Sequence, residues 1–92
     1  MYKIATSTKF KKDLKLAIKR GYNISLLDDV VTLLASGDTL DKIYLDHPLK
    51  GNYKGLRECH ITPDWLLIYQ IFEDALILSA SGTGTHSDLF AN

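Results

Sequence analysis

One run of eight residues decides the fold of this chain: WLLIYQIF, at positions 65–72. Successive side chains of an extended segment point to opposite faces, and here both faces are apolar apart from Gln70. A strand of this kind needs cover on both sides, so we expect it at the centre of a sheet. Helices are predicted to cover one face, and the other face must either be covered as well or have a functional role.

Short turns join this segment to an apolar segment on either side. Residues 56–61 precede it across the turn 62–64, where Pro63 supplies a fixed φ. Residues 75–80 follow it across the turn at 73–74. Connections this short join antiparallel neighbours, so the pattern predicts a three-stranded antiparallel meander.

The first half of the chain predicts a short strand and two helices. Residues 2–6 alternate as a strand does, and a helix with hydroxyl caps at residues 6–8 follows and ends at Gly21. A second apolar stripe at helical spacing predicts a helix that ends near Ser36, and residues 38–54 are expected to form a loop. The predicted fold class is therefore α+β. A short N-terminal strand and a helical hairpin pack on a small antiparallel sheet, in a single domain of residues 1–92.

Bulk composition narrows the class of protein. Hydrophobic residues make up 46% of the chain and charged residues 24%, which is typical of a globular domain. No apolar run approaches the roughly 20 residues that cross a bilayer, and the N-terminus lacks the layout of a secretory signal. Cys59 is the one cysteine, so no internal disulfide can form. A reducing cytoplasmic location without membrane attachment is expected.

Charge is distributed unevenly although the net charge is zero. Residues 1–20 hold seven basic groups and one acid, a balance of +6, whereas residues 21–92 hold four basic and ten acidic groups, a balance of −6. Clustered cations bind phosphates with release of counterions, although such runs also occur as solvated helix faces. The cations that could form such a phosphate-binding patch are Lys9, Lys11, Lys12, Lys15, Lys19 and Arg20.

Three histidines, His47, His60 and His86, lie near predicted turns or strand ends, where sites usually form. Cleavage of RNA without a metal needs a base for the 2′-hydroxyl, an acid for the leaving 5′-oxygen and a group that stabilises the phosphate. Histidine suits the first two roles, and Asp64 follows His60 across a turn. The alternative is that these histidines are ordinary polar groups.

Other residues leave two interpretations open. Trp65 and Phe90 could stack on unpaired bases, while Trp65 could instead belong to the sheet core. Cys59 is expected to face the core as a small hydrophobe. The histidines lack the compact spacing of zinc ligands, so neither a metal nor a cofactor is expected. The glycines at positions 82 and 84 are predicted to lie in a turn of the tail that leaves the last strand.

Four segments of the sequence resemble the YafQ branch of the RelE/ParE toxin superfamily: YLDHPLKG at 44–51, RECH at 57–60, PDWLLIY at 63–69 and GTHSDLF at 84–90. The resemblance implies a microbial-ribonuclease-like sheet and a toxin of a type II toxin-antitoxin system. It implies a ribosome-dependent endoribonuclease, an mRNA interferase, which cleaves messenger RNA in the A site of the 70S ribosome. It also implies a RelB/DinJ-like antitoxin, which we expect to be acidic and partly disordered. The basic patch of residues 9–20 is then expected to contact the ribosome or this antitoxin.

Carried over by position, the resemblance implies catalytic residues and substrate contacts. The catalytic residues are His47, His60, Asp64 and His86, and the substrate contacts are Trp65, Phe90 and Glu58. We expect His86 to be the acid and Asp64 or His60 to be the base.

One position departs from the family, because Gly82 stands where YafQ-like toxins usually carry an arginine. Lys50, Lys54 or Arg57 could supply the missing cation. If none does, the alternative is an attenuated or binding-only toxin of the superfamily, such as a gyrase inhibitor.

Overall fold

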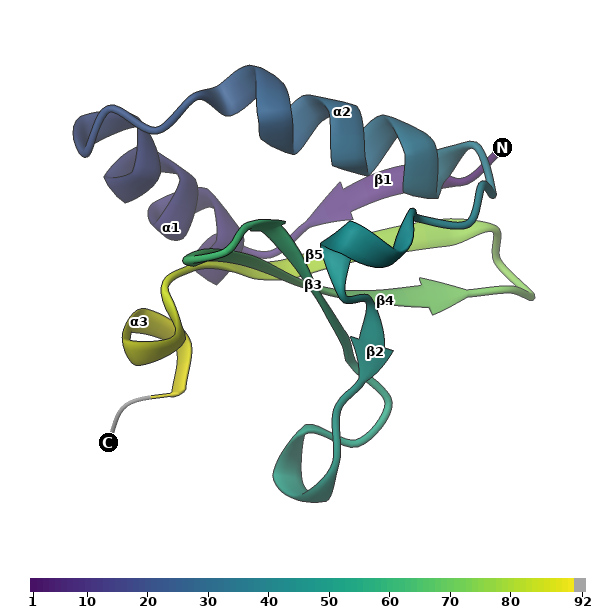
Figure 1. Ribbon diagram of the computed structural model, residues 1–92. Helices are drawn as coiled ribbons and strands as arrows, with labels where there is room; N and C mark the ends of the chain where they lie inside the picture. Colours follow the sequence, from purple (N-terminus) through teal and green to yellow (C-terminus); the bar gives the residue numbers. More distant parts are fainter. Residues whose placement is uncertain (91–92) are drawn as a thin grey trace.

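A five-stranded sheet with two helices on one face forms the body of the protein, in a computed structural model that describes residues 1–90 (Figure 1). The strands are β1 (Lys3–Thr6), β2 (His47–Pro48), β3 (Arg57–Thr62), β4 (Trp65–Phe72) and β5 (Ile77–Gly84). The helices are α1 (Thr8–Lys19), α2 (Ile24–Ala35) and α3 (His86–Phe90), with short 3₁₀ helices η1 (Lys42–Tyr44) and η2 (Gly51–Tyr53). None of the helices in this range is long and apolar enough to span a bilayer.

Local sequence accounts for the two long helices, which the pattern predicted. The Ser7 side chain caps α1 by accepting a hydrogen bond from the Phe10 N–H at 2.9 Å. The Asn23 side chain caps α2 in the same way. Gly21 and Gly37 follow the two helices with φ of 80° and 82°, a conformation that costs glycine little.

The meander of β3, β4 and β5 is antiparallel as predicted, and β4 is central in the order β1-β5-β4-β3-β2. The expectation of a purely antiparallel sheet is wrong at one edge, because β1 pairs with β5 in parallel. A parallel pair requires a crossover, and here the whole intervening chain supplies it. A two-residue strand, β2, also pairs with β3 inside the segment that was expected to be loop.

The last strand is longer and begins later than the predicted segment 75–80. The ladder with β4 continues until Gly82 lies opposite Ile68 and Gly84 opposite Leu66. The prediction that these glycines lie in a turn is therefore wrong, because β4 offers pairing partners along its full length. The turn lies before the strand instead, where Leu76 has a φ of 53°.

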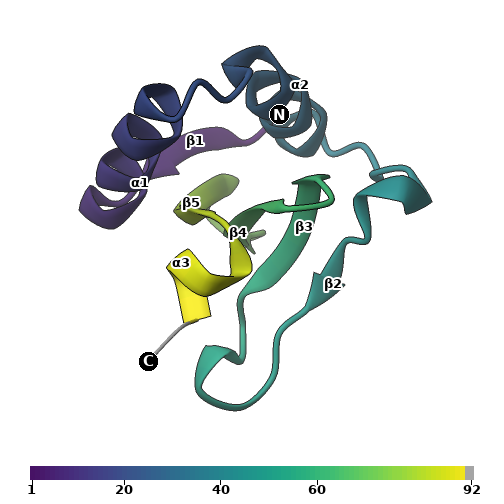
Figure 2. The same cartoon turned by 60° about the vertical axis from the view of Figure 1, so that its left-hand side comes forward.

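The two faces of β4 have different environments. Leu67 and Tyr69 are each 1% exposed and belong to the core under the helices, as do Cys59 and Val30. Leu66 and Ile68 point to the opposite face, which we call the open face. Figure 2 shows α3 on this side of the sheet, away from α1 and α2. The second apolar side of β4 therefore forms the floor of a surface outside the main core.

Candidate active site on the open face

A pocket of about 490 Å³ lies on the open face where β3, the β3–β4 turn and α3 meet. The residues that line it are His60, Pro63, Asp64, Leu66, Thr85, His86 and Ser87. Three of the four residues predicted to be catalytic therefore converge, because the register of β3, β4 and β5 brings residue 60 and residue 86 to the same end of the sheet. Leu66 supplies an apolar wall beside the ionisable groups.

A backbone contact orients the imidazole of His60. Its Nδ1 lies 3.2 Å from the carbonyl oxygen of Pro63. A carbonyl oxygen can only accept, so Nδ1 carries the proton in this contact. The neutral ring therefore has an unprotonated Nε2, which is the form that a general base needs.

Residues that cap α3 hold His86 at the pocket. The Thr85 N–H donates to Asp88 Oδ2 at 2.9 Å, and the Asp88 N–H donates to Thr85 Oγ1 at 3.1 Å, which is a capping box. Arg20 anchors the box to the end of α1 through two hydrogen bonds to Asp88, of 2.6 and 3.1 Å. Gly84 leaves the space for it, because a Cβ there would lie 3.0 Å from Asp88.

This arrangement perturbs the ionisation of both charged partners. The hydrogen bonds from Arg20 and from the Thr85 backbone hold the pKa of the Asp88 carboxyl well below its usual value. The hydrogen bond to Asp88 in turn raises the pKa of Arg20. Arg20 was predicted to contact the ribosome or an antitoxin, but in the structure its guanidinium holds α3. The Thr-x-x-Asp pattern of the cap was the available signal for the role of Asp88.

His47 does not join this pocket. Its Nε2 lies 3.1 Å from Glu58 Oε2 and its Nδ1 lies 2.6 Å from the Leu45 carbonyl oxygen. Both ring nitrogens are therefore engaged by protein groups. The Glu58 side chain was predicted to contact substrate; in the structure it is 8% exposed and faces His47. Burial explains the difference, since a buried carboxylate requires a partner.

Arg57 is also engaged within the protein. Its Nη2 donates to Asp46 Oδ2 at 3.1 Å, and the buried Tyr69 hydroxyl donates to the other oxygen of Asp46. Burial and the bond to Asp46 raise the pKa of Tyr69. Arg57 does not line the pocket, and its guanidinium is engaged by Asp46. Lys50 and Lys54 flank η2 as exposed side chains and do not line the pocket.

Trp65 belongs to the core, which was one of its two predicted placements. The side chain is 3% exposed, and its indole N–H donates to Thr83 Oγ1 at 2.8 Å. The ring packs on Tyr22, with 5.0 Å between centroids. Trp65 also lines a hollow of about 430 Å³ together with Tyr22 and Asp64, so its role in stacking on a base stays a prediction. Position 65 lies on the same face as the core residues Leu67 and Tyr69.

Phe90 remains available beside the pocket. Its ring lies 5.0 Å from the His86 ring and 5.1 Å from the Tyr53 ring. It lines a second hollow of the open face, which we call the Phe90 groove. The groove is lined by Lys9, Tyr53, Leu56, Ile68, Ser81, Gly82, Leu89 and Phe90. The pocket and the groove are neighbours, since Leu66 and Ile68 are alternate residues of β4.

Two remaining predictions concern Cys59 and the lysines. Cys59 is fully buried as expected, and burial raises the pKa of its thiol to about 12, which makes it a poor nucleophile. Residues 1–90 contain no group of three or more His, Cys, Asp or Glu side chains placed to hold a metal ion. Four exposed lysines of α1 make no salt bridge within the same range, and we call them the α1 lysine row: Lys11, Lys12, Lys15 and Lys19.

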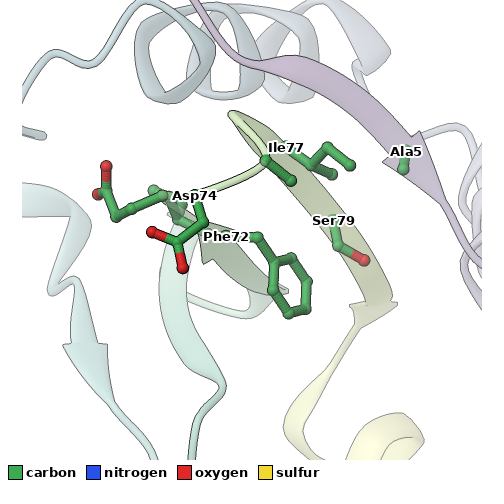
Figure 3. Close-up of a pocket in the computed structure, with 8 residues that line it drawn as sticks. Ala5, Phe72, Asp74, Ile77 and Ser79 are labelled. Carbon is green, nitrogen blue, oxygen red and sulfur yellow. The ribbon is translucent and has the colours of Figure 1, made fainter.

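A larger hollow, of about 670 Å³, lies near the β4–β5 turn (Figure 3). Its labelled residues include Ala5, Phe72, Asp74 and Ser79. The described residues that line it include no histidine, lysine or arginine. It therefore lacks the acid–base groups that the pocket at His60 and His86 brings together.

Known proteins match the chain over nearly its whole length. A family model described as "Bacterial toxin of type II toxin-antitoxin system, YafQ" matches residues 2–91. The mRNA interferase toxin YafQ of Escherichia coli strain K12 is 42% identical over 88 residues, covering 95% of this chain and 94% of that protein. The crystal structure of YafQ from E. coli strain BL21(DE3) has a TM-score of 0.91 at 40% identity, covering 98% of this chain and 99% of that chain. The YafQ chain of the E. coli DinJ–YafQ complex has a TM-score of 0.89 at 41% identity, covering 98% of this chain and 99% of that chain.

The fold and these matches define the class of protein, which is the toxins of bacterial type II toxin-antitoxin systems. Within that class the chain belongs to the YafQ family, whose model covers residues 2–91. The resemblance inferred from four short segments and the α+β fold class are thereby confirmed.

Proposed function

We propose that the protein is a metal-independent, ribosome-dependent endoribonuclease that cleaves messenger RNA in the A site and so inhibits translation in the cytoplasm. The observation that carries the proposal is the pocket in which His60, Asp64 and His86 meet beside the Phe90 ring. Its mRNA substrate is the one that the name of the E. coli relative states. Dependence on the ribosome fits a site whose groups lie on an open face, where a second surface can hold the message.

The chemistry needs two proton transfers at opposite ends of one phosphodiester. His60 Nε2 or the Asp64 carboxylate takes the 2′-hydroxyl proton, and the 2′-oxygen attacks the phosphorus. The bond from phosphorus to the 5′-oxygen breaks, and His86 donates a proton to that oxygen. The products are a 2′,3′-cyclic phosphate and a free 5′-hydroxyl, and the two proton transfers balance. Phe90 provides a ring on which a base can stack.

Ribosomes programmed with a defined message test the proposal. The unaltered protein should produce new 3′ ends within the A-site codon, and His86→Ala should slow cleavage about 10²–10⁴-fold. His60→Gln and Asp64→Asn identify the base, because the variant that lacks it should lose the dependence of rate on deprotonation at low pH. Intact message with the unaltered protein would contradict the proposal and favour a binding-only toxin, for which inhibition of gyrase is the corresponding assay.

The α1 lysine row provides a surface for a negatively charged partner. The E. coli relative has been crystallised in a DinJ–YafQ complex, which supports an antitoxin partner for this chain. We propose an acidic, partly disordered antitoxin that competes with ribosomal RNA for the α1 lysine row, since complementary charge orients docking. Saturating antitoxin should then displace the toxin from ribosomes. A stable complex of toxin, antitoxin and ribosome would contradict this competition.

A further inference from the structure

The backbone at Gly82 approaches α1 so closely that a side chain there would meet the helix. A Cβ built on Gly82 would lie 3.2 Å from Lys9 Nζ and 3.2 Å from Asp13 Oδ2. The ammonium group of Lys9 therefore lies at the position where a side chain of residue 82 would begin. Because Gly82 and Ile68 are opposite one another on the open face, this position belongs to the Phe90 groove.

Asp13 fixes the Lys9 ammonium in this place. Asp13 Oδ2 accepts hydrogen bonds from Lys9 Nζ at 2.7 Å and from the Thr83 backbone N–H at 3.1 Å. An ammonium has three N–H donors, so contact with Asp13 leaves two for another acceptor. The Lys9 side chain is 57% exposed, and solvent or a ligand can reach those donors.

Lys9 is also the one lysine or arginine among residues 1–90 that lines either the pocket or the Phe90 groove. The guanidinium groups of Arg20 and Arg57 are held by Asp88 and Asp46. Cleavage of a phosphodiester concentrates negative charge on the phosphate oxygens, and a cation in position stabilises that charge. The reaction therefore lacks an assigned group of this kind, and Lys9 has the place and the free donors to supply it.

We propose that Lys9 binds a non-bridging oxygen of the RNA phosphate in the Phe90 groove, and that Asp13 is the residue that positions it. The proposal rests on the endoribonuclease function proposed above. Lys9 carries this role from α1, outside the sheet that provides the acid and the base.

Cleavage of message on 70S ribosomes, measured in a single turnover at saturating ribosome, tests the role of Lys9. Lys9→Ala should lower the cleavage rate constant on the order of 10- to 100-fold, as removal of one charge-stabilising donor does. Lys9→Arg should retain most of the rate. Lys42→Ala removes the same charge from the exposed η1 helix and serves as the matched control, with an unchanged rate.

A second-site substitution separates a phosphate contact from a structural role. In Lys9→Ala, the added Gly82→Arg supplies a guanidinium from β5 to the Phe90 groove, and its Cβ requires Asp13 and Leu89 to give by tenths of an ångström. Cleavage should recover in this double variant, whereas a purely structural loss would not recover. Circular dichroism and thermal unfolding establish that each variant is folded. If the double variant does not fold, Lys9→Arg and Lys9→Gln decide the matter, with retention expected for the first and loss for the second.

Failure of this inference can be told from failure of the proposed function. Cleavage by the unaltered protein together with an equal rate for folded Lys9→Ala would overturn the role of Lys9 alone. A folded double variant without recovery would also overturn it. Intact message with the unaltered protein would overturn the endoribonuclease function, and the role of Lys9 with it.

Discussion

The hydroxyl of Thr83 joins β5 to the core and the site, and its removal should destabilise the protein strongly. Thr83 is 2% exposed. Its hydroxyl accepts from the Trp65 indole N–H at 2.8 Å and donates to the Leu66 carbonyl at 2.7 Å. Thr83→Val keeps the shape of the side chain but leaves both of these buried groups without that partner.

Each unsatisfied buried polar group costs about 1–3 kcal/mol, so two groups cost several. The new methyl offsets about 0.8 kcal/mol of this cost through the hydrophobic effect. We expect a net loss of about 2–4 kcal/mol in the free energy of unfolding. For a domain of this size that corresponds to a melting temperature lower by roughly 10–25 °C.

Urea unfolding followed by tryptophan fluorescence measures this loss directly, because Trp65 is the single tryptophan and contacts Thr83. Thr83→Ser is the matched control, since it keeps the hydroxyl and loses one methyl group, at a cost of about 1 kcal/mol. The order of stability should be unaltered protein, then Thr83→Ser, then Thr83→Val. A Thr83→Val protein as stable as the unaltered one would refute the assignment of both hydrogen bonds.

Further predictions concern charge, space and reactivity. The pKa of Asp88 is lowered in the folded state, so its bonds to Arg20 stabilise the protein fully above the ordinary carboxyl pKa of 3.8 and less as the pH falls below that value. The difference in free energy of unfolding between the unaltered protein and Asp88→Asn, measured by urea unfolding, should therefore shrink as the pH falls through this range. Gly84→Ala should displace α3 and slow cleavage while the sheet stays folded, as amide exchange can show. Cys59 should resist alkylation at neutral pH until the protein unfolds. Charge reversal in the α1 lysine row should weaken ribosome binding and flatten its salt dependence, whereas an unchanged salt slope would identify a solvated helix face.

Much of the fold could be predicted because its signals are local. The two apolar faces of residues 65–72 indicated a central strand, and helical spacing with capping residues placed both long helices. The parallel pairing of β1 with β5 could not be predicted in this way. It joins residues more than 70 positions apart, and nothing in a short alternating segment states which distant edge it will meet.

The site was predictable in part for the same reason. His60 and Asp64 lie on one turn, so sequence spacing brings them together, and His86 follows a strand that the meander returns to them. The internal partners of Trp65, Glu58 and Arg57, whose types suit RNA binding, could not be predicted. Their side chains instead satisfy partners inside the protein, and burial of that kind depends on packing.

The sequence by itself determined the elements of the protein, the family to which it belongs and the residue types available for acid–base chemistry, because periodicity, capping and motif spacing are local properties of the chain. Tertiary structure alone decided which of those residues share a pocket and which cations remain free. Lys9 lies on α1 and Arg20 caps its C-terminal end, and the sequence placed both in one basic surface. Folding separates their roles, because α1 crosses the end of β5. Arg20 there donates a hydrogen bond to Asp88, whereas the Lys9 ammonium lies in the space that Gly82 leaves open.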